Sequence, residues 1–305
     1  MKKKALLVCV SLLLAVSFVA IGCAAPAPAP APEALPEVAL GGILEKIDRT
    51  GKLVVGAREG AIPFGFYDEK GEWVGYSMDL AREVVLPKVE EVLGKDIELE
   101  FMPVTGKTRI PMIVAGTVDM VAGITTHTRA RDDVVDYSVT FFPDGTRMLV
   151  PKDSPIREWE DLAGKRVGCV LGTMDEKNLT KLNEHLSPLI QIKTYEKHTI
   201  GFLALKDGKT EAHVTDASVL AGLAAKAPDP ENWEVRGTFL AYSPLASIMR
   251  ENDSDFRDLV NFAIIEAIED GRLYEIYDRW FGPRGVVPFP MSEEVKAYFR
   301  LICWP

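Results

Sequence analysis

Short apolar runs alternate with stretches of helical periodicity along most of this 305-residue chain, and this alternation restricts the fold more than any other feature. Residues 53–55 are a buried-strand pattern, residues 77–93 carry apolar side chains at helical spacing, and residues 97–101 alternate like a half-buried strand. A short helix at 109–115 and a strand at 118–122 follow. Such a β-α-β-α-β order favours a parallel sheet with helices on both faces.

The same order then begins again, which predicts a second lobe. A weak internal repeat supports this, because the helix end, turn and strand at 113–119 are matched at 205–211. The expected elements are a short helix at 161–165, strands at 166–170, 190–195, 211–215 and 233–240, helices from Gly172-Thr173, at 199–205 and at 217–227, and one long amphipathic helix at 255–280.

The amino terminus reads as an export signal. Lys2 to Lys4 precede an apolar run to Ile21, and Gly22-Cys23 follows. This stretch resembles the lipobox of bacterial lipoproteins, which implies a signal peptide at 1–22 and lipidation of Cys23. An uncleaved membrane anchor is the alternative, although the run is near the lower limit for a span.

An alanine-proline tract comes next and cannot bury a core. Its alternating prolines favour an extended polyproline II conformation. Residues 23–40 are therefore expected to be a tether that holds the folded body away from a membrane.

Composition limits the partners and the chemistry. Apolar residues make up 47% and charged residues 26%, as in globular chains, and the formal net charge of -10 argues against a nucleic-acid partner. Cys169 and Cys303 remain after export, and they either pair or stay as a buried thiol and a tail thiol. Metal-ligand spacing is absent, and we expect no cofactor.

No enzymatic motif is present in the sequence. Gly106-Lys107-Thr108 lacks the first glycine of a phosphate loop, because Phe101 stands at that position. Nucleophile-elbow and zinc-protease motifs do not occur either. The chain is therefore not expected to be an enzyme.

Polar and charged residues gather instead at predicted strand ends and helix starts, where open α/β sheets bind ligands. Solvent exposure is the alternative for each arginine, and it is the preferred one for Arg129 and Arg147. A helix N-cap is the alternative for Asp216. The candidate residues are Arg58, Arg109, Thr126, Arg131, Thr173, Met174, His198 and Asp216.

A series of motifs in order resembles the extracellular solute-binding proteins of polar amino acid ABC importers (family 3), and within them the glutamate/aspartate-binding branch. The resemblance spans about residues 43–300. The motifs are Leu53-Val54-Val55-Gly56, Ile62-Pro63-Phe64, Val74-Gly75-Tyr76-Ser77, Arg109-Ile110-Pro111, Thr125-Thr126 through Arg131, Gly145-Thr146-Arg147, Asp161-Leu162, Asn232-Trp233-Glu234 and Trp280-Phe281.

The resemblance implies an α/β, two-lobed periplasmic-binding-protein fold of type II. Each lobe is a mostly parallel sheet flanked by helices, and two hinge segments join the lobes. Lobe 1 comprises 41–145 and 246–305, and lobe 2 comprises 150–240.

The resemblance also implies roles for individual residues. Arg131 and Thr126 match positions that hold the ligand α-carboxylate, and Asp216 matches the one that takes the α-ammonium. The positions around the side-chain carboxylate match Arg58, Arg109 and His198, and Thr173 and Met174 match lining positions.

The charges agree with this assignment, because a partly dry cleft must pair every charge of a dicarboxylic amino acid. Gly106, Ile124 and Met174 depart from the branch, which usually has Ser, Ser and Thr there. The loss of these hydroxyls widens the expected ligand from glutamate or aspartate to include a related acidic amino acid.

The resulting hypothesis is a monomeric, lipid-anchored binding protein on the outer face of the cytoplasmic membrane. It captures the amino acid by hinge closure and delivers it to an ABC permease and its ATPase. The alternatives are an enzyme on the same scaffold, similar to cyclohexadienyl or arogenate dehydratase, and a ligand-sensing receptor module.

Overall fold

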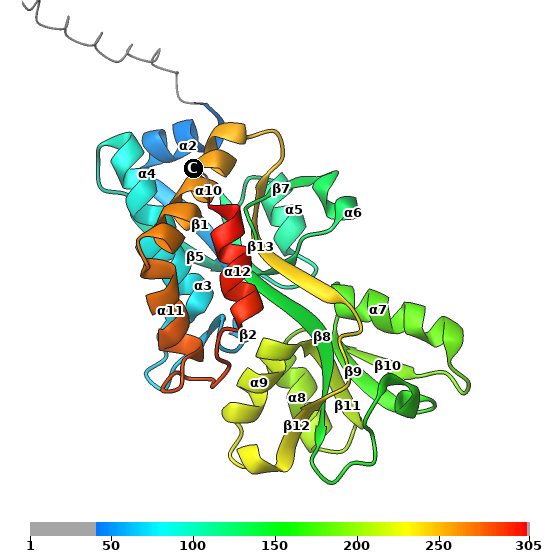
Figure 1. The fold of residues 1–305 in the computed structure, drawn as a ribbon. Helices are drawn as coiled ribbons and strands as arrows, with labels where there is room; N and C mark the ends of the chain where they lie inside the picture. Colours follow the sequence, from blue (N-terminus) through cyan, green and yellow to red (C-terminus); the bar gives the residue numbers. More distant parts are fainter. Residues whose placement is uncertain (1–40, 304–305) are drawn as a thin grey trace, which may run out of the picture. The chain divides into compact units, whose positions relative to one another are not determined.

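The computed structural model describes residues 41–303, which form a mixed α/β body (Figure 1). The expected signal peptide at 1–22, the tether at 23–40 and the lipidation residue Cys23 lie outside the described residues. Within 41–303, no helix has both the length and the apolar character needed to cross a membrane.

Strands and helices alternate along the described chain as predicted. The helices are α2 (Gly42–Thr50), α3 (Tyr76–Asp79), η1 (Leu80–Val85), α4 (Leu86–Leu93), α5 (Arg109–Val114), α6 (Arg129–Asp132), η2 (Trp159–Leu162), α7 (Met174–Leu182), η3 (Asn183–His185), α8 (His198–Lys206), α9 (Ala217–Ala225), η4 (Pro230–Asn232), α10 (Ser254–Glu269), α11 (Arg272–Phe281) and α12 (Glu293–Ile302). The strands are β1 (Lys52–Ala57), β2 (Gly60–Ala61), β3 (Gly65–Tyr67), β4 (Trp73–Val74), β5 (Glu98–Pro103), β6 (Met120–Thr126), β7 (Val135–Tyr137), β8 (Phe142–Pro151), β9 (Arg166–Val170), β10 (Gln191–Tyr195), β11 (Ala212–Asp216), β12 (Trp233–Arg236) and β13 (Tyr242–Arg250).

A 10-stranded sheet runs in the order β10-β9-β11-β8-β13-β6-β1-β5, with β12 paired to β8 and β7 to β13. At one end β5, β1 and β6 pair in parallel, and at the other end β10, β9 and β11 do. The long strands β8 and β13 are antiparallel to their neighbours and to each other. The alternating sequence predicts the two parallel halves, and the resemblance implies the two segments that join them, which are these two strands.

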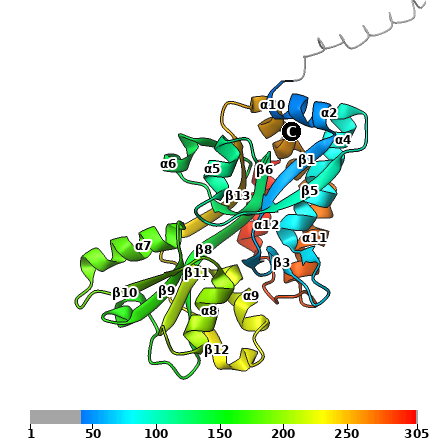
Figure 2. The same cartoon turned by 180° about the vertical axis from the view of Figure 1, so that it is seen from behind.

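Helices cover both faces of each half. Figures 1 and 2 show α7 on one side of the β9–β11 half and α8 and α9 on the other. A smaller hydrophobic core, which includes Val167, Cys169 and Leu179, fills the space beneath α7. A larger core occupies the other half and extends to Leu220 of α9.

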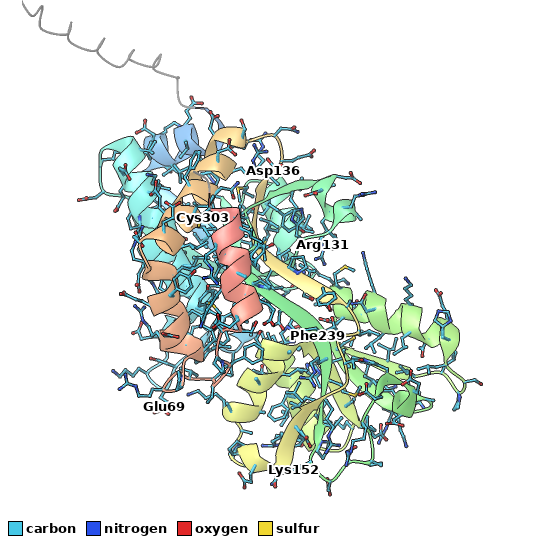
Figure 3. All side chains as sticks on the ribbon, in the orientation of Figure 1. Glu69, Arg131, Asp136, Lys152, Phe239 and Cys303 are labelled. Carbon is cyan, nitrogen blue, oxygen red and sulfur yellow. The ribbon has the colours of Figure 1, made fainter. Side chains whose placement is uncertain are left out.

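The two halves meet where β8 pairs with β13, from Gly145 opposite Tyr242 to Phe142 opposite Leu245. Phe239, labelled in Figure 3, lies at this junction, because a Cβ built on Gly145 would fall 2.6 Å from its ring. The predicted hinges at 145–150 and 240–245 fall on or beside these strands. The exact lobe boundaries stay a prediction.

Two of the expected elements differ from the structure. The continuous helix at 255–280 is two helices, α10 and α11, separated at Gly271 with a φ of 93°. Apolar residues continue at helical spacing on both sides, so the periodicity alone does not reveal the break. The strand expected at 233–240 is also shorter and ends at Arg236, before Gly237 with a φ of 81°.

Both described cysteines are free. Cys169 is buried in the smaller core, while Cys303 follows α12 at the other end of the body (Figure 3). The alternative in which the two thiols stay unpaired is therefore the one that the structure supports.

Candidate functional site

Seven of the eight candidate ligand-binding residues line a single small cavity. The lining residues are Arg58, Arg109, Ile124, Thr126, Thr173, Met174, Asp175, His198, Thr215 and Asp216.

The lining residues come from both halves of the sheet. Arg58 follows β1, Thr126 ends β6 and Asp216 ends β11, while Arg109 and His198 are the first residues of α5 and α8. Carboxyl ends of parallel strands and amino ends of the helices that follow them meet at the same edge of a sheet. This geometry is why residues far apart in sequence gather here.

Arg109 and Arg131 are held by strand β6 and the turn after it. The Nη1 of Arg109 donates to the carbonyl oxygen of Ile124 at 2.9 Å and to Oγ1 of Thr125 at 3.2 Å. Arg131 (Figure 3) does not line the cavity; its Nη1 donates to the carbonyl oxygen of Thr126 at 2.9 Å, and the side chain is buried. Arg131 therefore lies behind Thr126, within the same cationic group.

The first turn of α7 contributes three lining residues. Thr173 is the N-cap, accepts from the backbone nitrogen of Glu176 and donates to the carbonyl oxygen of Val170 at 2.7 Å. Asp175 is buried two residues later and lies on the cavity wall. Asp175 and Thr215 also line the cavity and are not among the predicted site residues, although each is adjacent to one of them.

His198 is fully enclosed and stands edge-on to a second buried histidine, His213, with 6.0 Å between the ring centroids. Burial lowers the pKa of His198 well below its usual value, and Arg58 nearby adds to this. The imidazole is therefore neutral at pH 7.

Asp216 occupies the N-cap position of α9, yet its side chain forms no capping hydrogen bond. Asp144 of β8 performs that role instead, since its Oδ2 accepts from the backbone nitrogen of Ser218 at 3.1 Å and from the Ser218 hydroxyl. The Asp216 carboxylate is thereby left to face the cavity.

Several buried polar atoms at this cavity make no hydrogen bond with any described residue. They include both ring nitrogens of His198. Buried polar groups are nearly always satisfied, so each exception requires a partner of another kind. The remaining atoms are Arg58 Nη1, Arg109 Nε and Asp216 Oδ1.

Burial opposes the charged form of each ionisable group in the cavity. It lowers the pKa of Arg58 to about 10, against the opposing attraction of Asp175 and Asp216. The pKa of Arg109 is lowered by burial and then by the nearby Arg131 and Arg58. Burial raises the pKa of Asp216, with further contributions from Asp175 and Asp144. A ligand that carries the complementary charges relieves these penalties.

The three departures from the expected branch fall at different places. Ile124 and Met174 line the cavity, but Gly106 does not. A Cβ on Gly106 would lie 2.5 Å from the carbonyl oxygen of Leu171, so the two halves touch through backbone there. Gly106 is thus a contact between the halves rather than a lost hydroxyl in the cavity.

The arginines that were expected to be solvated differ in environment. Arg129 is exposed, whereas Arg147 is half-buried and its Nε donates to the carbonyl oxygen of Gly237 at 2.7 Å. Neither lines the cavity. Among residues 41–303 no group of three or more His, Cys, Asp and Glu side chains is arranged to hold a metal ion.

Comparison with known proteins gives consistent matches over most of the chain. The model of the bacterial extracellular solute-binding proteins, family 3, matches residues 53–283. The L-glutamate/L-aspartate-binding protein of Pseudomonas aeruginosa is 36% identical over 272 residues, which cover 87% of this chain and 89% of that protein. The glutamate/aspartate import solute-binding protein of Salmonella typhimurium is 34% identical over 267 residues, covering 86% and 88%.

A solved structure agrees with this fold. A crystal structure of a mutant ArgBP from T. maritima superposes with a TM-score of 0.70 at 29% sequence identity, covering 78% of this chain and 98% of that one. The family match over residues 53–283 includes every residue that lines the cavity.

Proposed function

Because the chain belongs to the bacterial extracellular solute-binding proteins of family 3, with the type II fold, we propose that it captures an acidic amino acid, glutamate or aspartate, for an ABC importer. The amino acid is bound in the cavity between the two halves of the sheet and is then delivered to a membrane permease.

The observation that carries this proposal is the set of unpaired buried atoms at one cavity. Arg58 Nη1 and Arg109 Nε are donors, and Asp216 Oδ1 is an acceptor beside them. A dicarboxylic amino acid supplies acceptors for the guanidinium groups and an ammonium for the aspartate. Arginine binds carboxylates well because its planar fork matches their geometry.

Each ligand group is assigned a place. Thr126 holds the α-carboxylate with Arg131 directly behind it, and Asp216 holds the α-ammonium. The side-chain carboxylate lies among Arg58, Arg109 and His198, and Thr173 and Met174 complete the wall. Each charge of the ligand thus meets an opposite charge of the site, as a buried site requires, and one guanidinium charge remains over.

Binding is coupled to hinge closure. The ligand first contacts the half that carries Arg131, and the half that carries Asp216 then closes over it by bending at 145–150 and 240–245. The periplasmic binding proteins are a standard case of such hinge motion. Direct contacts between the two halves, such as Gly106 against Leu171, support closure of this kind.

The exported form is held by lipid on Cys23, with 23–40 as the tether, at the outer face of the cytoplasmic membrane. The closed monomer is the form that the permease and its ATPase recognise. Two features of the sequence support this location: the leader, which resembles a lipobox, and the alanine-proline tract. The body itself acts as a carrier rather than as an enzyme.

Calorimetry with glutamate, aspartate and neutral amino acids tests the proposal. Arg131→Ala and Asp216→Ala should each weaken glutamate binding by roughly a hundredfold or more, since an unpaired buried charge costs about 3–5 kcal/mol. Arg129→Ala is the matched control, because Arg129 lies on the same short helix as Arg131 but is exposed. Unchanged affinity in both site variants would refute the site.

A turnover assay with prephenate and arogenate tests the alternative of an enzyme on this scaffold. Dehydration of either compound by the wild-type protein would favour that alternative. Absence of turnover together with tight amino acid binding would leave the carrier function.

A further inference from the structure

Asp175 adds a second carboxylate to the wall of the ligand cavity. It is the second residue of α7, only 4% of the residue is exposed, and it lines the cavity together with Arg58 and Asp216. The assignment of ligand groups given above uses every charged lining residue except this one.

Two hydroxyls fix the position of the Asp175 carboxylate. Its Oδ1 accepts from Oγ1 of Thr146 at 2.8 Å, and its Oδ2 accepts from Oγ1 of Thr215 at 3.2 Å. Thr146 lies on β8 and Thr215 on β11, so three elements hold the group in place. Both hydroxyls are neutral donors, so they do not compensate a negative charge on Asp175.

The counter-charges of Asp175 are therefore the guanidinium groups of the cavity. Its attraction is the larger of the two that support the charged form of Arg58, ahead of Asp216. Burial raises the pKa of Asp175, and the hydroxyls of Thr146 and Thr215 and then the charge of Arg109 oppose that rise. Asp175 thus acts on the two arginines assigned to the distal carboxylate of the ligand.

This placement changes the charge that the cavity demands of a ligand. Three guanidinium groups stand against two cavity carboxylates, which leaves an excess of one positive charge. A dicarboxylic amino acid neutralises that excess, and an amide leaves a single positive charge. Without Asp175, an amide ligand would leave two positive charges, and discrimination against it would be stronger.

We propose that Asp175 is a specificity-determining residue that lowers the preference of the cavity for a distal carboxylate over a distal amide, so that glutamine or asparagine is accepted beside glutamate or aspartate. This inference rests on the proposed function, because it concerns the same ligand site. The occupant class becomes the amino acids whose short side chain ends in a carboxylate or a carboxamide.

Calorimetry on the full chain with glutamate, glutamine, aspartate and asparagine tests the proposal. Asp175→Asn keeps groups that can hydrogen-bond to both threonines but removes the charge. The ratio of the glutamine Kd to the glutamate Kd should rise roughly tenfold or more in this variant. The reason is that the charge of Asp175 repels the distal carboxylate of glutamate but not the neutral amide of glutamine. The aspartate and asparagine pair should shift in the same direction.

Glu184→Gln is the matched control, because Glu184 is exposed on the turn after α7 and its loss removes one negative charge from the same half. The Kd ratios should stay unchanged in this variant. Thermal unfolding checks that Asp175→Asn is folded. If that variant is unfolded, Asp175→Ser replaces it and must shift the Kd ratios in the same direction.

The outcomes separate the two proposals. Failure of the wild-type protein to bind any of the four amino acids would refute the proposed function. Binding by the wild type, together with Kd ratios that are unchanged or lower in a folded Asp175 variant, would overturn only the role of Asp175.

Discussion

Glu59 and Lys197 form an ion pair between the two halves of the sheet, with 2.5 Å between Oε2 and Nζ. Glu59 follows Arg58 at the end of β1, and Lys197 precedes His198 at the start of α8. The pair therefore joins the two halves of the sheet directly beside two residues of the proposed ligand site.

Loss of this ion pair should speed ligand release. The side chains of Lys197 and Glu59 are 41% and 22% exposed, so solvent screens the pair and its contribution is at most about 1 kcal/mol. Lys197→Ala should raise the rate of glutamate dissociation by roughly twofold to fivefold, with a smaller effect at high salt. Stopped-flow fluorescence measures the rate, and Lys209→Ala, which removes a local pair with Asp207, should leave it unchanged.

Gly106 should be required for full closure. A Cβ there would lie 2.5 Å from the Leu171 carbonyl oxygen, a distance that real Cβ contacts do not reach. Gly106→Ala should therefore weaken ligand affinity by roughly tenfold or more, because part of the binding free energy is used to force the halves together. The melting temperature without ligand should change little.

Calorimetry and small-angle scattering with saturating glutamate distinguish the outcomes for Gly106. The scattering should show a more open protein in the variant than in the wild type. Gly41→Ala is the control, because no atom lies within 4 Å of a Cβ at that position. If Gly106→Ala bound glutamate with wild-type affinity, the backbone at Leu171 would be able to shift away from the added Cβ without a loss of binding free energy.

The sequence predicts much of this site because topology alone determines it. Arg58, Thr126 and Asp216 each follow or end a strand, and parallel strands bring their carboxyl ends to one edge. The structure places these three on one cavity, as expected from the order of the elements. Their individual contacts with the ligand stay a prediction.

What the sequence does not reveal depends on long-range contacts. The orientation of Asp175 is set by Thr146, which lies 29 residues earlier on β8, and no local pattern encodes that hydrogen bond. The ion pair between Glu59 and Lys197 spans 138 residues. The break at Gly271 is local, yet the apolar stripe of α10 and α11 continues past it and conceals it.

His213 should make the protein less stable in mild acid. Burial lowers its pKa from 6.5 to about 4, and neither ring nitrogen has a hydrogen-bond partner among the described residues. Between these two values the unfolded chain binds a proton that the folded chain does not. Above pH 6.5, His213 is neutral in both the folded and the unfolded chain and does not lower the free energy of unfolding. As the pH falls from 6.5 to 4, protonation of the unfolded chain lowers that free energy by about 3 kcal/mol.

Replacing His213 by leucine should remove that dependence. Urea unfolding of the wild type and of His213→Leu between pH 4 and 7 measures the free energy of unfolding of each protein as a function of pH. The difference between these two free energies should vary with pH with a slope that corresponds to at most one proton. His185→Leu is the control, because His185 is exposed. Parallel curves for the wild type and His213→Leu would contradict the assignment.

Asp144 should stabilise the fold through the amino terminus of α9. Its Oδ1 accepts from the backbone nitrogen of Gly145 at 2.7 Å, and its Oδ2 accepts from the backbone nitrogen of Ser218 at 3.1 Å. Burial raises the pKa of Asp144 only to about 6, so the carboxylate is ionised at pH 7 and these are bonds to a charged acceptor.

Asp144→Ala leaves buried donors unpaired and should lower the free energy of unfolding by roughly 3 kcal/mol. The variant should also weaken ligand binding, because α9 begins directly after Asp216. Chemical denaturation at pH 7 checks the first effect and calorimetry the second, with the exposed Asp133→Ala as control. If Asp144→Ala matched the wild type in both measurements, the backbone of α9 would hold Asp216 in place without help from β8.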